Sequence, residues 1–226
     1  MTTITTTHRA SARWVPYALV ALSFMPAIFG SLRLTGLAGG PSLMPMDPRI
    51  DASPLPVIVH IASVIPYSLL GAFQFSSRLR QRHPRQHRMT GRVLVPLALI
   101  VALSGLWITL DYPVKPGSGM VLFAIRLVVG TAMAASVGLG FAAIRHGDVP
   151  RHRAWMTRAY ALALGAGTQV FTGAFGPSLV GTSVLAHDLT MGAAWVINLA
   201  VAEIVIRRGR DVRRPVRVVA SRVEPA

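Results

Sequence analysis

Residues 78–110 read RLRQRHPRQHRMTGRVLVPLALIVALSGLWITL, in which six arginines precede a long apolar run. Between residues 93 and 110 the run contains no charged side chain. A helix of about 20 apolar residues crosses the roughly 30 Å hydrocarbon core of a bilayer. Clustered arginines are typical of the cytoplasmic boundary of such a helix. This part of the chain therefore predicts a membrane-spanning helix that begins beside a basic loop.

The composition of the whole chain agrees with that prediction. Of its 226 residues, 52% are hydrophobic and only 14% are charged, yet the formal net charge is +15. A soluble domain carries about 25% charged residues, so this chain lacks the polar surface to face water on all sides. The same figures exclude a disordered chain, a collagen and a coiled coil. Since there are no cysteines, disulfides, thiolate metal sites and cysteine nucleophiles are excluded as well.

Six segments are long and apolar enough to span, so the sequence predicts an all-α integral membrane bundle of six transmembrane helices. The first is interpreted as a retained anchor, because it is longer than the apolar part of a cleaved signal peptide. Residues 1–13 and 207–226 are expected to be an N-terminal tail and a basic C-terminal tail on either side of a transmembrane domain, residues 14–206. The predicted helices cover about residues 14–32, 54–75, 89–110, 120–144, 154–175 and 182–206.

The arginines predict how this bundle is oriented. Of the 23 basic residues, 19 lie before the first helix, in or beside the loop between the second and third, around the loop between the fourth and fifth, or after the sixth. Basic residues accumulate on the cytoplasmic side of membrane proteins. Both termini are therefore expected in the cytoplasm, where the arginine loops would meet the anionic headgroups of the bilayer. Topology alone accounts for the basic charge, so no nucleic-acid partner is expected.

Two of the basic loops resemble each other. Residues 79–88, LRQRHPRQHR, align without gaps on residues 144–153, IRHGDVPRHR, which pairs His87 with His152. Each loop joins an inward-running helix to an outward-running one, so the match suggests a parallel repeat of two helix hairpins, the second and third helices and the fourth and fifth. Chance similarity between two arginine-rich loops is the alternative.

Ionisable residues inside a span are costly and mark candidate sites. His60, Arg126, His187 and Asp188 lie five or six residues from the outer ends of their helices, which is roughly 8–10 Å deep at 1.5 Å per residue. One interpretation is structural: Arg126 forms a buried ion pair with Asp188, and the histidines bond to backbone or hydroxyl groups. The other makes His60 and His187 the axial ligands of a haem b, with Arg126 facing a propionate.

A second pair of histidines, His87 and His152, lies at equal depth near the cytoplasmic boundary and is a further hypothetical haem ligand pair. Beside arginines at an interface, such residues more often bind phosphate headgroups. Glu203 is expected to pair with Arg92 or Arg158. Tyr67 and Gln74 belong to a polar stripe on one face of the second helix, which is expected to face the bundle interior.

Several segments resemble a bacterial family of predicted multi-pass membrane proteins that is known only as a domain of unknown function. The resemblance is carried by HRxxGR at residues 87–92 and by HRxWMxRxYAL at residues 152–162, and it covers about residues 14–208. It implies a multi-pass protein of the bacterial inner membrane and no particular activity. A looser likeness to di-haem cytochrome b proteins implies haem on the central helices, although here one ligand would come from the last helix.

The sequence thus indicates a multi-pass inner-membrane protein with a buried polar site near the outer leaflet. One hypothesis is a haem b redox module that exchanges electrons with a quinone. Alternatives are an anion- or lipid-binding transporter-like module and a structural subunit of a membrane complex. No motif of a hydrolase or a transferase is found, so a catalytic residue cannot be assigned.

Overall fold

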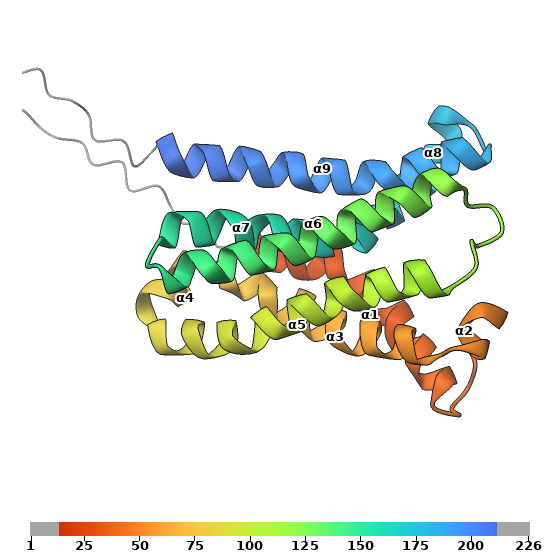
Figure 1. The fold of residues 1–226 in the computed structure, drawn as a ribbon, viewed down its shortest axis with the longest axis horizontal. Coiled ribbons are helices and arrows are strands. Elements are labelled where there is room, and N and C mark those ends of the chain that lie inside the picture. Colours follow the sequence, from red (N-terminus) through yellow and green to blue (C-terminus); the bar gives the residue numbers. More distant parts are fainter. Residues whose placement is uncertain (1–13, 212–226) are drawn as a thin grey trace, which may run out of the picture.

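The fold is an all-α bundle, as predicted. A computed structural model describes residues 14–211, and these form nine helices (Figure 1). Residues 1–13 and 212–226, the expected N-terminal tail and most of the expected basic tail, lie outside the described residues. The helices are α1 (Val15–Leu37), α2 (Pro48–Ala52), α3 (Leu55–Gln74), α4 (Ser77–Arg82), α5 (Pro84–Asp111), α6 (Met120–Arg145), α7 (Val149–Ala163), α8 (Gly165–Val180) and α9 (Val184–Asp211).

Five of these helices are long and apolar enough to cross a membrane, namely α1, α3, α5, α6 and α9. Between 11% and 39% of the residues in their most apolar windows are buried inside the bundle. Large apolar side chains such as Phe24, Trp107 and Phe141 therefore lie on its outer surface. A soluble protein rarely exposes so much apolar surface, whereas a bilayer covers it.

The predicted single helix over residues 154–175 is wrong. In its place α7 ends at Ala163 and α8 begins at Gly165, with Leu164 between them. The two helices have 15 and 16 residues, and each is shorter than the roughly 20 residues that a crossing needs. The pattern of apolar residues continues through the break, which is why periodicity did not detect it.

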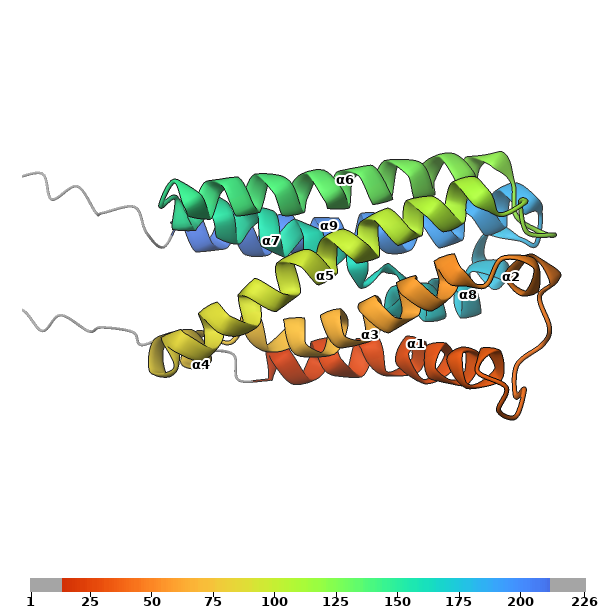
Figure 2. The same ribbon diagram turned by 60° about the horizontal axis from the view of Figure 1, so that its bottom comes forward.

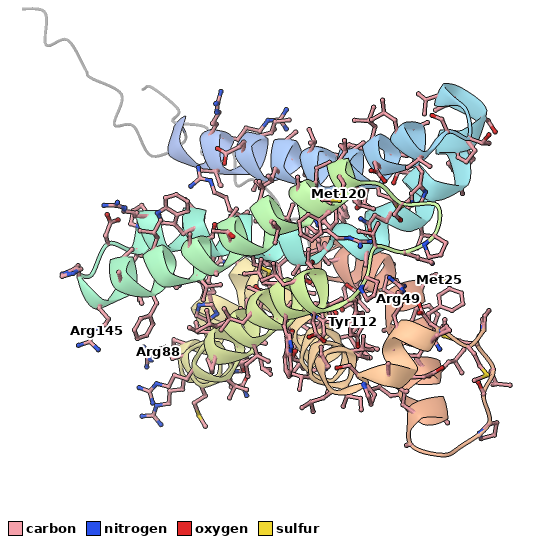
Figure 3. The ribbon with its side chains drawn as sticks, turned by 45° about the vertical axis from the view of Figure 1, so that its right-hand side comes forward. Met25, Arg49, Arg88, Tyr112, Met120 and Arg145 are labelled. Carbon is pink, nitrogen blue, oxygen red and sulfur yellow. The ribbon has the colours of Figure 1, made fainter. Side chains whose placement is uncertain are left out.

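The basic segments gather at one end of the bundle. The helix α4, the turn between α6 and α7 and the end of α9 lie at this end, whereas α2, the α5–α6 loop and the α8–α9 turn lie at the other (Figures 1 and 2). Arg88 and Arg145 mark the first end, and Arg49 and Tyr112 mark the second (Figure 3). We name these the basic end and the opposite end.

Tyrosines on α3 and α7 fix the centre of the bundle. The ring of Tyr160 meets that of Tyr67 edge-on, with 5.7 Å between centroids, and its hydroxyl donates to the carbonyl of Ser68 at 2.5 Å. Gly71 makes room for the ring, since a Cβ there would lie 2.6 Å from Tyr160 Cε2. Tyr67, which the polar stripe singled out, is therefore a buried packing residue of this core.

Candidate functional site

Asp188 of α9 caps the start of α6. Its carboxylate accepts the backbone N–H of Gly119, at 2.9 Å to Oδ1 and 3.0 Å to Oδ2, and that of Leu122 at 3.0 Å. These amides have no partner within the helix, and they carry the positive end of its dipole. Asp188 is only 1% exposed. A Cβ at Gly119 would lie 2.7 Å from Oδ2, so the carboxylate needs glycine at this position.

The ion pair expected between Arg126 and Asp188 is therefore wrong. Among the described residues the salt bridges are Arg49 with Asp47 and Arg158 with Glu203. The Asp188 carboxylate instead accepts hydrogen bonds from backbone amides at the start of α6. The neighbouring His187 contacts the loop that precedes α6, since its Nε2 lies 3.5 Å from Ser118 Oγ.

His60 of α3 is held by α5. Its Nδ1 lies 3.0 Å from Ser104 Oγ, and Ser104 Oγ in turn lies 2.6 Å from the carbonyl oxygen of Ile100. A hydroxyl has one proton to give. If Ser104 donates it to Ile100, then Ser104 accepts from His60 Nδ1–H, and Nε2 carries the free lone pair. This chain of hydrogen bonds corresponds to the tautomer of His60 that carries its proton on Nδ1.

His60 and Arg126 line the same cavity. It has a volume of about 530 Å³ and lies between α1, α3, α5, α6 and the two helices α7 and α8, with one residue of α9, Trp195, in its wall. Arg126 is exposed, and no hydrogen bond or ion pair is formed by its guanidinium within residues 14–211. Most of the wall is apolar, as at Ile65, Val129 and Met133. His187 and Asp188 are not among the lining residues, so the four residues predicted at equal depth divide into two places.

The rim of this cavity carries two more cations, Arg49 and Lys115. Arg49 is fixed by Asp47, at 2.6 Å from Nη2 to Oδ2, and by the carbonyl of Pro113 at 3.1 Å. The hydrogen bonds from Arg49 hold the pKa of Asp47 below its usual value. Among the described residues that line the cavity there are three cations and no carboxylate. Since Asp47 neutralises Arg49, Lys115 and Arg126 supply the net positive charge of the lining residues.

The break between α7 and α8 forms part of the cavity wall. Leu162, Leu164 and Gly167 line the cavity. At the end of α7 the carbonyl of Leu162 accepts from Trp195 Nε1 at 3.1 Å, and the carbonyl of Ala161 accepts from Asn198 Nδ2 at 3.1 Å. Backbone groups inside a membrane must find partners within the protein. The side chains of α9 supply them here, which lets the helix end at mid-bundle.

Two glycines bring α8 close to its neighbours at this break. A Cβ at Gly165 would lie 2.1 Å from Trp195 Nε1, and one at Gly167 would lie 2.3 Å from the carbonyl oxygen of Leu22. Both distances are far below van der Waals contact, so larger residues would force the helices apart. Small residues of this kind let membrane helices approach closely.

At the basic end, Glu203 pairs with Arg158, as expected for one of its two possible partners. Arg158 Nε lies 2.5 Å from Glu203 Oε1 and Nη2 lies 3.0 Å from Oε2. The same guanidinium stacks over the ring of Trp155 at 4.6 Å. Arg92, the other possible partner, is an exposed residue of α5.

His87 and His152 differ in their bonding. His152 Nδ1 lies 2.8 Å from the carbonyl oxygen of Gly140 in α6, to which it donates. His87 Nδ1 is buried without a hydrogen-bond partner, and so is the side-chain nitrogen of Gln74. Both histidines belong to the basic end, and neither of them lines the cavity.

Sequence reasoning missed several residues of the cavity wall. Ser104 and Trp195 are single polar or amphipathic side chains within apolar runs, and nothing in the spacing marks them. Gly165 and Gly167 are the signal for the break that the sequence contains, but glycines in a span indicate close packing and do not locate the end of a helix. Arg49 and Lys115 lie far apart in the sequence, and no local pattern brings them to a common cavity.

Taken together, the apolar outer surface and the helices long enough to span define a multi-pass helical membrane protein. Comparison with known families makes this specific. Residues 57–206 match the family described as predicted membrane protein DUF2306, and the chain belongs to that family. No curated protein and no solved structure matches the chain.

Proposed function

We propose that this protein binds an anionic amphiphile, a molecule with a negatively charged head and an apolar tail, in the cavity lined by His60 and Arg126. The observation that carries the proposal is a mostly apolar wall that holds Arg126, with Lys115 and the Asp47-paired Arg49 also lining the cavity. A charged residue inside a membrane costs roughly 2.5–3.5 kcal/mol on insertion scales. An anion bound beside Arg126 would offset that cost.

The residues would divide the task by position. The Arg126 guanidinium offers parallel N–H groups to a carboxylate or phosphate head, and Lys115 adds charge at the rim. The tail would lie along Val129, Met133 and the broken helix, where burial contributes about 0.8 kcal/mol per methylene.

Quenching of Trp195 fluorescence tests this proposal, because Trp195 lines the cavity. The chain has four tryptophans, so the other three are replaced by phenylalanine. In neutral detergent, dibromostearate is expected to quench Trp195, and Arg126→Gln is expected to weaken its binding about tenfold, as for the loss of one charge-assisted hydrogen bond.

Two controls make the test specific. Arg33→Gln removes a cation that does not line the cavity and is expected to leave binding unchanged. The corresponding brominated alcohol, which has no charge, is expected to quench weakly and to be insensitive to Arg126→Gln. Equal binding of the carboxylate to the wild-type protein and to Arg126→Gln would contradict the proposal.

A haem b in the same cavity is the second candidate, favoured by the presence of His60 and Arg126 in one wall. His60 Nε2 would bind the iron, and Arg126 would face a propionate; exchange of electrons with a quinone would follow. His187 contacts Ser118 instead of the cavity, so a bis-histidine site would need α9 to shift. Purified protein from haem-supplied cells would show a Soret band lost in His60→Ala, whereas colourless folded protein would exclude this candidate.

We further propose that α7 and α8 together make a sixth crossing, with both termini and the basic end in the cytoplasm of a bacterial cell. The support is the chain direction: α6 runs toward the basic end, α9 also runs toward it, and α7 and α8 connect them across the bundle (Figure 1). The arginines of the basic end would then meet anionic headgroups.

A further inference from the structure

Two buried polar atoms at the basic end lack hydrogen-bond partners. They are Nε2 of Gln74, the last residue of α3, and Nδ1 of His87, in the first turns of α5. Arg80 lies between these elements and donates to the carbonyl of Gln74 at 3.0 Å. A buried polar group without a partner costs free energy, so each such atom calls for an explanation.

Comparison with His152 shows that the missing partner is particular to His87. Both histidines lie four residues after a helix cap, His83 or Asp148, and their backbone N–H groups donate to the carbonyl of that cap at 3.1 and 2.9 Å. His152 Nδ1 is satisfied by the Gly140 carbonyl. The two histidines therefore have equivalent positions in their helices, but only the imidazole of His152 has a hydrogen-bond partner at Nδ1.

Three arginines surround His87. Arg80, Arg88 and Arg153 lie close enough to interact electrostatically with its ring, and among the side chains that the structure describes no carboxylate does so. Of the described acids at the basic end, Asp148 caps α7 and Glu203 pairs with Arg158. A compact group with several acceptor oxygens and more than one negative charge fits such surroundings, and phosphate has both properties.

We propose that His87 and Gln74, together with Arg80, Arg88 and Arg153, form a binding site for a phosphate group. His87 and Gln74 are only half-buried, so part of each side chain lies at the surface of the basic end. The phosphate belongs either to a lipid headgroup or to a free phosphate compound. This site is separate from the cavity at the opposite end and does not depend on it.

Histidine-specific ¹⁵N NMR of the full chain tests the site directly. In nanodiscs of phosphatidylcholine, inorganic phosphate is expected to shift one imidazole resonance, and that resonance is absent from His87→Gln. His87→Gln is expected to weaken phosphate binding, measured by isothermal titration calorimetry, about tenfold, as for loss of one charge-assisted hydrogen bond. His146→Gln is the matched control, because His146 is exposed at the same end, and it should bind as the wild type does.

A second arm distinguishes the two sources of phosphate. A shift with inorganic phosphate supports a site open to free phosphate compounds. If the same resonance moves only when phosphatidic acid is added to the nanodiscs, the site takes lipid headgroups. Gln74→Leu is a second variant that should weaken binding in either case. The proposal is overturned if sodium chloride at equal ionic strength gives the same shift, or if the folded His87→Gln and Gln74→Leu proteins bind as the wild type does.

Discussion

At the scale of single residues, several buried polar side chains in this protein form hydrogen bonds to the backbone at helix ends and at the helix break. Asp188 looked like one half of an intramembrane ion pair, but it accepts three backbone hydrogen bonds at the start of α6. Arg126 is left facing a cavity as a result. The two residues therefore have different consequences when they are replaced.

Asp188→Ala is expected to destabilise the protein by about 2–3 kcal/mol, because it leaves buried helix N–H groups without an acceptor and removes a charge from the positive end of a dipole. Unfolding in detergent, followed by circular dichroism, measures the loss. Asp51→Ala, at an exposed position, should change stability by no more than about 0.5 kcal/mol. Similar stability of the two variants would contradict the cap.

Asp47→Asn is expected to lower the unfolding temperature at neutral pH and to have less effect in acid. Since hydrogen bonds from Arg49 lower the pKa of Asp47, the carboxylate stabilises the folded state above its unfolded pKa of about 3.8. This contribution is lost as the pH falls through the lower, folded value. Thermal unfolding of both proteins at about pH 7 and about pH 3 measures it, and a difference that stays constant across this range would refute the assignment.

At the scale of elements, the break between α7 and α8 is the feature that departs most from a simple bundle. Discontinuous helices are tolerated inside membranes where neighbours satisfy the freed backbone groups and where the break borders a cavity. Both conditions hold here: Trp195 and Asn198 bond to the freed carbonyls, and the break lines the cavity. The close approach at Gly165 makes this arrangement possible.

Gly165→Ala is expected to destabilise the protein, because the added Cβ would collide with Trp195 and disturb its bond to the Leu162 carbonyl. The cost should be smaller in a Trp195→Ala background, where the collision is absent. A double-mutant cycle from unfolding measurements gives this coupling, which for contacting residues is about 0.5–3 kcal/mol.

Gly138→Ala is the control for that cycle. A Cβ at Gly138 would meet nothing within 4 Å, and alanine favours a helix over glycine by up to about 1 kcal/mol. This variant should therefore be as stable as the wild type or more so. Additive effects of Gly165→Ala and Trp195→Ala would show that the two residues do not act together.

At the scale of the whole molecule, the arginines gather at one end of an apolar bundle, which predicts its orientation in a membrane. The chain has no cysteines, so single cysteines report on each end without interference. Leu43, at the opposite end, is 71% exposed, and His146, at the basic end, is also exposed.

In intact bacteria, Leu43→Cys is expected to react with a membrane-impermeant maleimide, and His146→Cys is expected to react only after the membrane is opened. The reason is that basic residues are retained on the cytoplasmic side. Reaction of His146→Cys in intact cells would contradict the proposed orientation. Reaction of neither residue in opened membranes would indicate a misfolded protein, which the unfolding measurements above would detect.

The sequence by itself determined the class of this protein and the positions of most of its helices. Hydropathy is a local property that sums over about 20 neighbouring residues, so the all-α membrane fold could be predicted, and so could the basic end. The pairing of Glu203 with Arg158 was also within reach, because both residues lie near the same helix ends.

Only the tertiary structure decided which buried groups meet. His60 forms a hydrogen bond with Ser104, and Asp188 accepts hydrogen bonds at the start of α6. The carbonyls at the end of α7 accept hydrogen bonds from Trp195 and Asn198. Equal depth in the membrane placed His60, Arg126, His187 and Asp188 at one level but did not specify their direction around the bundle. That direction depends on how helices rotate and pack against each other, and packing is settled by contacts between segments far apart in the chain.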